Sequence, residues 1–193
     1  MELLIPSGYV PLDEIKTPLI FLAGPIGGGE KGGVAWQTTA LEFFLPYEVT
    51  VASPKAYEPE DPVYKYLRIG DGQKFHDALG WERYYLRGAA QKGCLVLWMP
   101  EESKTHPKLD GIFGRDTRPE SGEWRAKCAA NRNLRIEAGI EPGFSGASVV
   151  QRNFWYEFQD PDRSPLLPAD QTSFTFHDKL EDTLRAALVR CGI

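Results

Sequence analysis

Short apolar runs without polar interruption recur along the chain, a pattern typical of strands buried on both faces of a parallel sheet. The runs predicted as strands are Leu19–Ala23, 49–52, Cys94–Met99 and 134–138. A weaker pattern places a fifth strand near either 148–150 or 154–158. Gly24 and Pro25 follow the first run directly, so that strand is expected to end in a loop.

Apolar residues at helical spacing lie between and after these runs. The spacing predicts helices over 35–44, 75–91 and 120–130, and a C-terminal amphipathic helix over 174–191. Gly93 is suited to close the second helix, and Pro119 fits the first turn of the third. A loop-rich insertion is expected near 53–73, and the stretch from Gly139 to the C-terminal helix is also expected to be rich in loops.

Strands that alternate with helices at this spacing predict a parallel sheet covered by helices on both faces. We therefore expect an α/β fold of the flavodoxin-like, doubly wound type, formed by residues 1–193 as a single domain. Such sheets bind ligands outside the carboxyl ends of their strands, where the strand order reverses. The loops that follow Ala23, Met99 and Ala138 are therefore the expected site.

The charge of the chain narrows the choice of ligand. The 193 residues carry a formal net charge of −5, whereas nucleic-acid binding needs a basic surface that neutralises phosphates. A nucleic-acid partner is therefore not expected, and a small uncharged or singly charged substrate suits the chain better. Neither a membrane span of roughly 20 apolar residues nor a signal-peptide pattern is present. We expect a cytoplasmic protein without a membrane partner.

The cysteines and histidines do not form a disulfide or metal-binding pattern. They are Cys94, Cys128 and Cys191, and His76, His106 and His177. The three cysteines are far apart and suit a reducing compartment, and the histidines are scattered. We therefore expect no metal and no cofactor.

A glycine-rich stretch, residues 24–33, follows the first predicted strand and precedes a helix. Backbone N–H groups in such a loop can surround a phosphate at a helix N-terminus. The stretch does not match the P-loop motif, because Lys31 is followed by Gly32 rather than by serine or threonine. Two interpretations stay open: a segment that lines a ligand, and a connector whose glycines allow close backbone packing.

Two acidic residues, Glu120 and Glu123, open the helix after the third predicted strand. Carboxylates in a first turn also interact favourably with the helix dipole, so a structural role alone would account for them. Their position at the ligand-binding end of the sheet favours a chemical role, because residues one turn apart share a helix face. Two nearby carboxyl groups can divide nucleophilic and proton-transfer work when their environments separate their pKa values.

Four segments carry a resemblance to a known family. They are Phe21-Leu22-Ala23-Gly24-Pro25, Trp81-Glu82, Leu95-Val96-Leu97-Trp98-Met99-Pro100 and Thr117-Arg118-Pro119-Glu120-Ser121-Gly122-Glu123-Trp124. In this order they resemble the nucleoside 2-deoxyribosyltransferase family, including its nucleotide N-glycosidase relatives, over residues 19–140. In that family a glutamate followed by one residue and then glycine attacks the anomeric carbon of the sugar. Glu120-Ser121-Gly122 matches this pattern, with serine where an aliphatic residue is usual.

The resemblance implies that Glu120 is the catalytic nucleophile, with a glycosyl-enzyme ester as intermediate and overall retention of configuration. It also implies that Glu82 faces the departing base, although an acidic residue on an exposed helical face would look the same in the sequence. The family's aspartate before the nucleophile falls on Gly114 here. Asp116 is the nearest substitute for this catalytic position, and Asp110 is a more distant one.

The other expected substrate contacts are Gly24, Pro25, Ile26, Arg118, Glu123 and Asn153. Arg118 and its neighbour Arg115 are candidates to bind a substrate phosphate, and a structural ion pair with an acidic residue is an equal alternative. In the transferases a neighbouring subunit completes the pocket, often with an amide side chain, and Asn153 stands at roughly that position. The resemblance therefore implies a homo-oligomer.

The function that the resemblance implies is exchange of the base of a 2′-deoxynucleoside, with a nucleoside and a free base as the small-molecule partners. The first alternative is hydrolysis of a nucleoside 5′-monophosphate by the same chemistry. The second is a nucleotide-sensing module that has kept the fold without catalysis, which the departures at Ser121 and Gly114 keep open.

Overall fold

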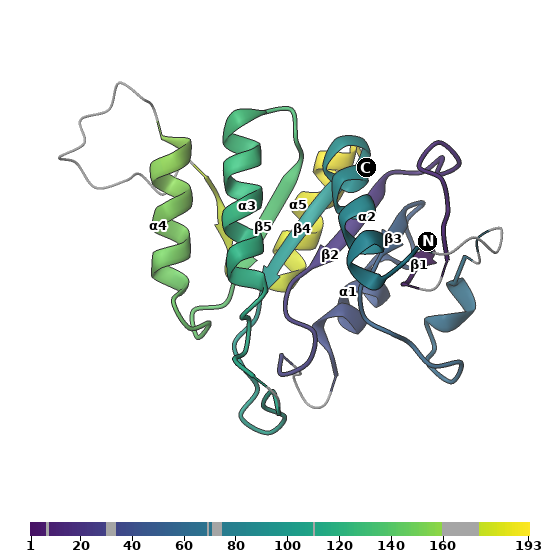
Figure 1. Ribbon diagram of the computed structural model, residues 1–193, viewed down its shortest axis with the longest axis horizontal. Coiled ribbons are helices and arrows are strands. Elements are labelled where there is room, and N and C mark those ends of the chain that lie inside the picture. The colour runs from purple at the N-terminus through teal and green to yellow at the C-terminus, as the bar shows by residue number, and fades with distance from the viewer. Residues whose placement is uncertain (7, 30–33, 69, 71–74, 110, 160–173) are drawn as a thin grey trace.

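The computed structural model describes residues 1–6, 8–29, 34–68, 70, 75–109, 111–159 and 174–193. Within these ranges, six parallel strands form one sheet in the order β1-β3-β2-β4-β5-β6 (Figure 1). Their bounds are Glu2–Leu4 (β1), Leu19–Ala23 (β2), Thr50–Ala52 (β3), Cys94–Met99 (β4), Ile136–Ile140 (β5) and Phe176–His177 (β6). Without the edge strand β1, this is the flavodoxin-like order, which confirms the predicted fold class.

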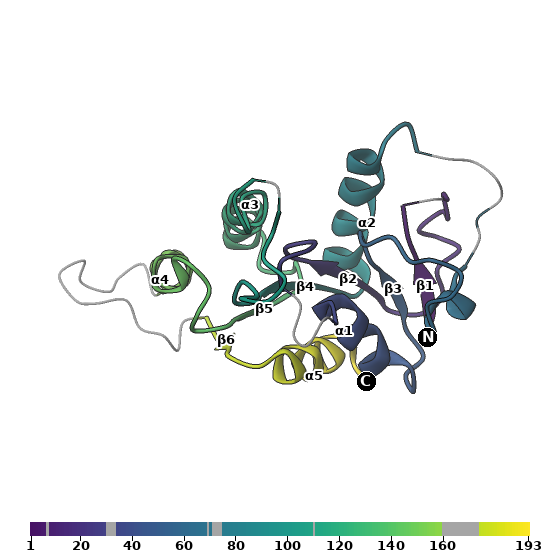
Figure 2. The same cartoon turned by 90° about the horizontal axis from the view of Figure 1, so that it is seen from below.

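Helices cover both faces of the sheet, as Figure 2 shows, with α2, α3 and α4 on one face and α1 and α5 on the other. Their bounds are Trp36–Phe44 (α1), Ala78–Lys92 (α2), Thr117–Ala130 (α3), Ala147–Phe158 (α4) and Leu180–Cys191 (α5). Every residue of β2, β4 and β5 is buried. Cover on both faces therefore explains why these strands are apolar without alternation.

Two apolar cores lie on either side of the sheet. Trp81 and Trp124 bury their indoles in the core under α2 and α3, and Phe44 and Leu184 pack in the core under α1 and α5. None of the helices in the described ranges has the length and apolar character needed to span a membrane.

The predictions failed mainly after β4. The strand expected at 134–138 is β5, which begins and ends two residues later. Both positions proposed for a further strand, 148–150 and 154–158, lie in helix α4. The last strand is instead Phe176–His177, so the C-terminal helix begins at Leu180 rather than near 174. Phe154 is the only fully buried residue of α4, and a helix with so narrow an apolar face gives a weak periodic signal.

The N-terminal edge of the sheet was also not predicted. β1 pairs with β3, and beyond it the backbone N–H of Arg68 donates to the carbonyl of Leu3 at 2.8 Å. The described part of the expected insertion near 53–73 contains a short 3₁₀ helix, Tyr64–Tyr66. This segment therefore packs along the sheet edge.

Candidate active site

A cavity of about 680 Å³ opens at the carboxyl ends of β2 and β4, where the strand order reverses. The loops that follow these two strands lie together at the lower edge of the sheet in Figure 1. The wall of this cavity contains seven residues that were predicted from the sequence: Gly24, Pro25, Ile26, Glu82, Asp116, Glu120 and Glu123. The fold thus brings together seven of the nine residues that the sequence singled out.

The loop after β2 is held in place by close packing. A side chain at Gly24 would put its Cβ 2.2 Å from the carbonyl oxygen of Trp98, so only glycine allows this approach. Trp36 Nε1 and Gln37 Nε2 both donate to the carbonyl of Pro25, at 3.0 and 3.1 Å. Gly24, Pro25 and Ile26 therefore line the cavity on a fixed backbone, while residues 30–33 of the glycine-rich stretch lie outside the described residues.

Helix α2 delivers Glu82 to the cavity. Asp77 caps its N-terminus by accepting a hydrogen bond from the backbone N–H of Gly80 at 2.7 Å. Trp81, which directly precedes Glu82, is buried against Phe21 of β2, with ring centroids 5.8 Å apart. Because successive helix residues point about 100° apart, this anchor leaves Glu82 at the edge of the buried face, beside the cavity.

Helix α3 delivers Glu120 in the same way. Its buried residues Thr117, Ser121, Trp124 and Cys128 recur at helical spacing and face the sheet. Glu120 and Glu123 each precede a member of this stripe, so they lie on its flank and reach the cavity wall. Ser121, the departure from the family pattern, is accommodated because its hydroxyl donates to the carbonyl of Arg118 at 2.7 Å.

Glu82 and Glu120 are hydrogen-bonded to each other across the two helices. Burial, followed by the neighbouring charge of Glu82 and this hydrogen bond, raises the pKa of Glu120 to about 8. Burial also raises the pKa of Glu82. Since a hydrogen bond between two carboxyl groups needs a proton on one of them, the pair carries one proton and one negative charge between its two ionisations.

Glu123 has a different environment from Glu120. Its two carboxylate oxygens accept from Arg83 Nη1 and Lys127 Nζ, each at 2.5 Å, and these bonds lower its pKa. Glu123 therefore stays ionised and has no proton to give. The sequence suggested that Glu120 shares its chemistry with Glu123, whereas the structure pairs Glu120 with Glu82.

Asp116 lies in the cavity wall with an exposed carboxylate, 3.2 Å from Arg115 Nε. Gly114, on which the family's aspartate falls, has a φ of +65°, and a Cβ there would lie 3.0 Å from the ring of Phe144. A side chain at this position would be strained. Asp116 is thus the carboxylate that this loop presents to the cavity, and Asp110 lies outside the described residues.

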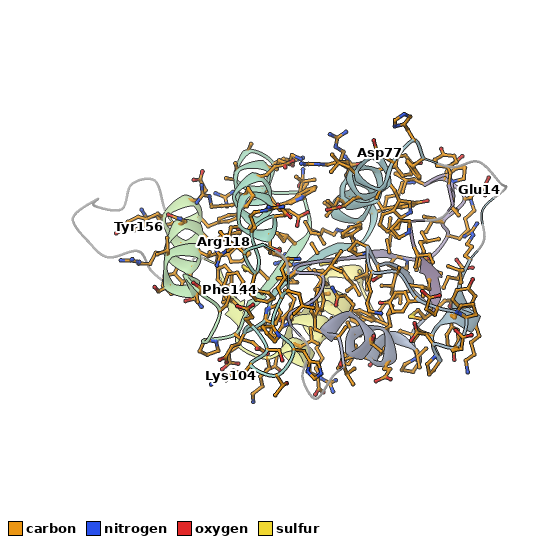
Figure 3. The ribbon with its side chains drawn as sticks, turned by 60° about the horizontal axis from the view of Figure 1, so that its bottom comes forward. Glu14, Asp77, Lys104, Arg118, Phe144 and Tyr156 are labelled. Atoms are coloured by element: carbon orange, nitrogen blue, oxygen red, sulfur yellow. The ribbon has the colours of Figure 1, made fainter. Side chains whose placement is uncertain are left out.

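Arg118 and Asn153 do not line the cavity that holds Glu120. They line a separate cavity of about 340 Å³ between α3 and α4. Arg118 donates to the carbonyls of Phe113 and Ser145 at 2.9 and 3.1 Å, and its guanidinium lies 5.1 Å from the ring centre of Phe144 (Figure 3). Of the two interpretations of Arg118, the geometry supports a structural one, although its partners are carbonyls rather than a carboxylate.

Five further residues in the wall were not singled out in the sequence: Pro54, Leu79, Arg83, Lys108 and Ile112. Arg83 adjoins Glu82, but its ion pair with Glu123 joins two helices that only the tertiary structure brings together. Lys108 and Ile112 lie in an irregular loop without a periodic pattern to indicate their direction.

No protein-family model and no curated protein sequence matches the chain. Among the described residues, no three His, Cys, Asp or Glu side chains converge to hold a metal ion. The site is therefore judged on its geometry and charges.

Proposed function

We propose that the protein cleaves the N-glycosidic bond of a 2′-deoxynucleoside and transfers the deoxyribosyl group to another base, as a nucleoside 2-deoxyribosyltransferase. The observation that carries this proposal is the hydrogen-bonded Glu82–Glu120 carboxyl pair, which lines a cavity at the switch point of the sheet. Such a pair holds both groups that the reaction needs: a carboxylate nucleophile and a proton donor.

The hydrogen bond between the pair raises the pKa of Glu120 and lowers that of Glu82, so Glu120 holds the shared proton in the free enzyme. In the first half-reaction this proton passes across the hydrogen bond to Glu82, and the Glu120 carboxylate attacks C1′ of the sugar as the bond from C1′ to the base nitrogen breaks. The bonding electrons leave with the base, and Glu82 donates its proton to that base. The products are a neutral glycosyl ester on Glu120, a neutral free base and the Glu82 carboxylate. The pair began with one negative charge and ends with one, so the buried site gains no net charge.

In the second half-reaction, an incoming base attacks C1′ from the face that the first base left. Glu82 accepts the proton of the attacking nitrogen, and the ester electrons return to Glu120 as its carboxylate. Two displacements at one carbon retain the configuration. Asp116 supplies an acceptor for a sugar hydroxyl at the cavity wall, and the loop of Gly24, Pro25 and Ile26 closes one side of the pocket.

The test is a product assay. Purified protein is incubated with a 2′-deoxynucleoside and a different free base, and new nucleosides are separated by chromatography. The proposal expects base-dependent exchange, loss of at least about 1,000-fold in Glu120→Gln, and wild-type rates in Glu157→Gln, a control on the exposed side of α4. Binding of nucleosides without any turnover would favour a sensing module instead.

A second candidate, hydrolysis of a nucleoside 5′-monophosphate, is favoured by two basic residues. Lys108 and Arg115 line the same cavity as Glu120, and either cation can balance a substrate phosphate. Water then takes the place of the incoming base. Release of a free base from a monophosphate, without exchange when a second base is added, would assign the protein to this activity.

The transferase proposal also extends to the location, the oligomeric state and the substrates of the enzyme. We infer a cytoplasmic homo-oligomer that works on a nucleoside and a free base, without a cofactor. Sedimentation velocity of the purified protein tests the oligomer, and a single monomeric species across the concentrations used for the assay would remove this part of the proposal.

A further inference from the structure

Two side-chain contacts join α2 to α3 beside the cavity. Adjacent residues of α2, Glu82 and Arg83, reach residues one turn apart on α3, Glu120 and Glu123. The first contact is the proton-sharing carboxyl pair, and the second is an ion pair of 2.5 Å. All four residues line the cavity.

The second contact is more constrained than an ordinary surface ion pair. Exposed pairs contribute little to stability, and the side chains of Arg83 and Glu123 are 43% and 31% exposed. Glu123, however, has both carboxylate oxygens engaged, one by Arg83 and one by Lys127. Its rotamer is thereby held from two sides, and Arg83 has a fixed partner on the opposite helix.

We propose that Arg83 is a positioning residue for the reaction: its ion pair with Glu123 holds α2 and α3 in register, and so sets the separation and the electrostatic environment of the two reacting carboxyls. The inference rests on the proposed function for its activity measurement. A catalytic pair needs such support because a displacement of about 1 Å can cost about 100-fold in rate.

The charges around Glu120 make the proposal testable. Glu82 and Arg83 act on it from α2 and Glu123 from α3. Arg83 lowers the pKa of Glu120, whereas Glu123 raises it. Asp116, Lys108 and Arg115 complete the charged groups of the cavity wall. Replacing Arg83 alone should therefore raise the pKa of the carboxyl pair, and replacing Glu123 alone should lower it.

The experiment compares Arg83→Gln, Glu123→Gln and Lys127→Gln in the full chain. Lys127 is the matched control, because it also binds Glu123 but does not line the cavity. The carboxyl carbons of ¹³C-labelled glutamate are followed by NMR over pH, and Glu120→Gln and Glu82→Gln assign the signals of the pair. This titration needs no turnover, so it remains informative if the proposed function is wrong.

The expected result is a higher pKa of the carboxyl pair in Arg83→Gln and a lower one in Glu123→Gln, with little change in Lys127→Gln. In the exchange assay, kcat should fall about 10-fold to 100-fold in Arg83→Gln with a small change in KM, because positioning rather than binding is lost. Arg83→Lys should recover part of kcat, since it restores the charge without the planar guanidinium.

Two outcomes would overturn the proposal. If Arg83→Gln and Glu123→Gln shift the titration in the same direction or not at all, the ion pair does not set the environment of the carboxyls. If both variants titrate as expected but Arg83→Gln keeps the wild-type kcat in an enzyme shown to be active, the Arg83–Glu123 ion pair does not position the reacting groups. Absence of exchange and hydrolysis in the wild type, with opposite titration shifts, would overturn only the proposed function.

Discussion

Glu82 on α2 and Glu120 on α3 are hydrogen-bonded to each other in the wall of one cavity, although strand β4 and the loop after it separate the two helices in the sequence. Each carboxyl group comes to this point because the tryptophan near it in its own helix, Trp81 or Trp124, is buried on the sheet. The pair is therefore a product of core packing as much as of the site itself, and several measurable consequences depend on it.

Replacing the proton donor should slow the reaction selectively. In Glu82→Gln the leaving base receives no proton, so the exchange rate should fall by about 100-fold to 10,000-fold. The loss should be smallest for nucleosides whose bases leave most easily without a proton. Steady-state rates over a series of deoxynucleosides check this, and an equal loss for every base would argue against Glu82 as the proton donor.

Stability should depend on pH through Glu120. Burial and the neighbouring Glu82 raise its pKa in the folded state from the ordinary value of 4.5 to about 8, so its contribution to stability is present below pH 4.5 and is lost as pH rises towards 8. Glu120→Gln cannot ionise and should lose less stability than the wild type over this interval. Urea unfolding midpoints at pH 4.5 and pH 8 check the difference, and parallel pH profiles for the two proteins would contradict it.

Three aliphatic side chains should hold the apolar part of the substrate. Ile26, Leu79 and Ile112 are 48%, 59% and 67% exposed, and all three line the cavity. Since each buried CH₂ contributes about 0.8 kcal/mol, Ile112→Ala should raise KM by about 10-fold with little loss of stability. Leu109→Ala is the control, because Leu109 is 97% exposed in the same loop and does not line the cavity. Equal KM values for both variants would exclude this role.

Two glycines of one loop should differ sharply. In Gly24→Ala the new Cβ meets the backbone oxygen of Trp98 and the ring of Trp36, so the loop must move, at a cost of about 3 kcal/mol. Gly27→Ala has no atom within 4 Å of its Cβ and a φ of +76°, so only backbone strain of about 1 kcal/mol is expected. Thermal unfolding and KM of both variants check this ranking, which the reverse order would contradict.

Arg115 and Arg118 are neighbours with different surroundings, and their alanine variants should separate the two candidate activities. Arg115→Ala removes a cation from the cavity wall and should raise KM for a nucleoside monophosphate more than for a nucleoside. Arg118→Ala removes two hydrogen bonds to backbone carbonyls and should lower stability by about 1–3 kcal/mol instead. A monophosphate-specific effect in Arg118→Ala would return this residue to the substrate site.

The central strands of the fold follow from local sequence patterns. β2 and β4 are buried on both faces, so each is a continuous apolar run. Such a run predicts a strand without any knowledge of the segments that pack against it. The end of α2 at Gly93 and the start of α3 around Pro119 depend on local backbone geometry, so they were predicted as well. Alternation of these elements implies a parallel sheet, and with it the edge at which Glu120 lies.

Which of these side chains meet depends on contacts between distant segments, and local patterns do not encode them. Helix α4 has one fully buried residue, so its sequence carries little of the periodicity that a helix on a core face shows. Arg118 looks like a phosphate ligand in the sequence, but the fold directs it to two carbonyls. Glu82, Arg83 and Glu120 come together because two helices pack on one face of the sheet. Local patterns record burial and backbone preference, whereas contacts between distant segments depend on how those segments pack.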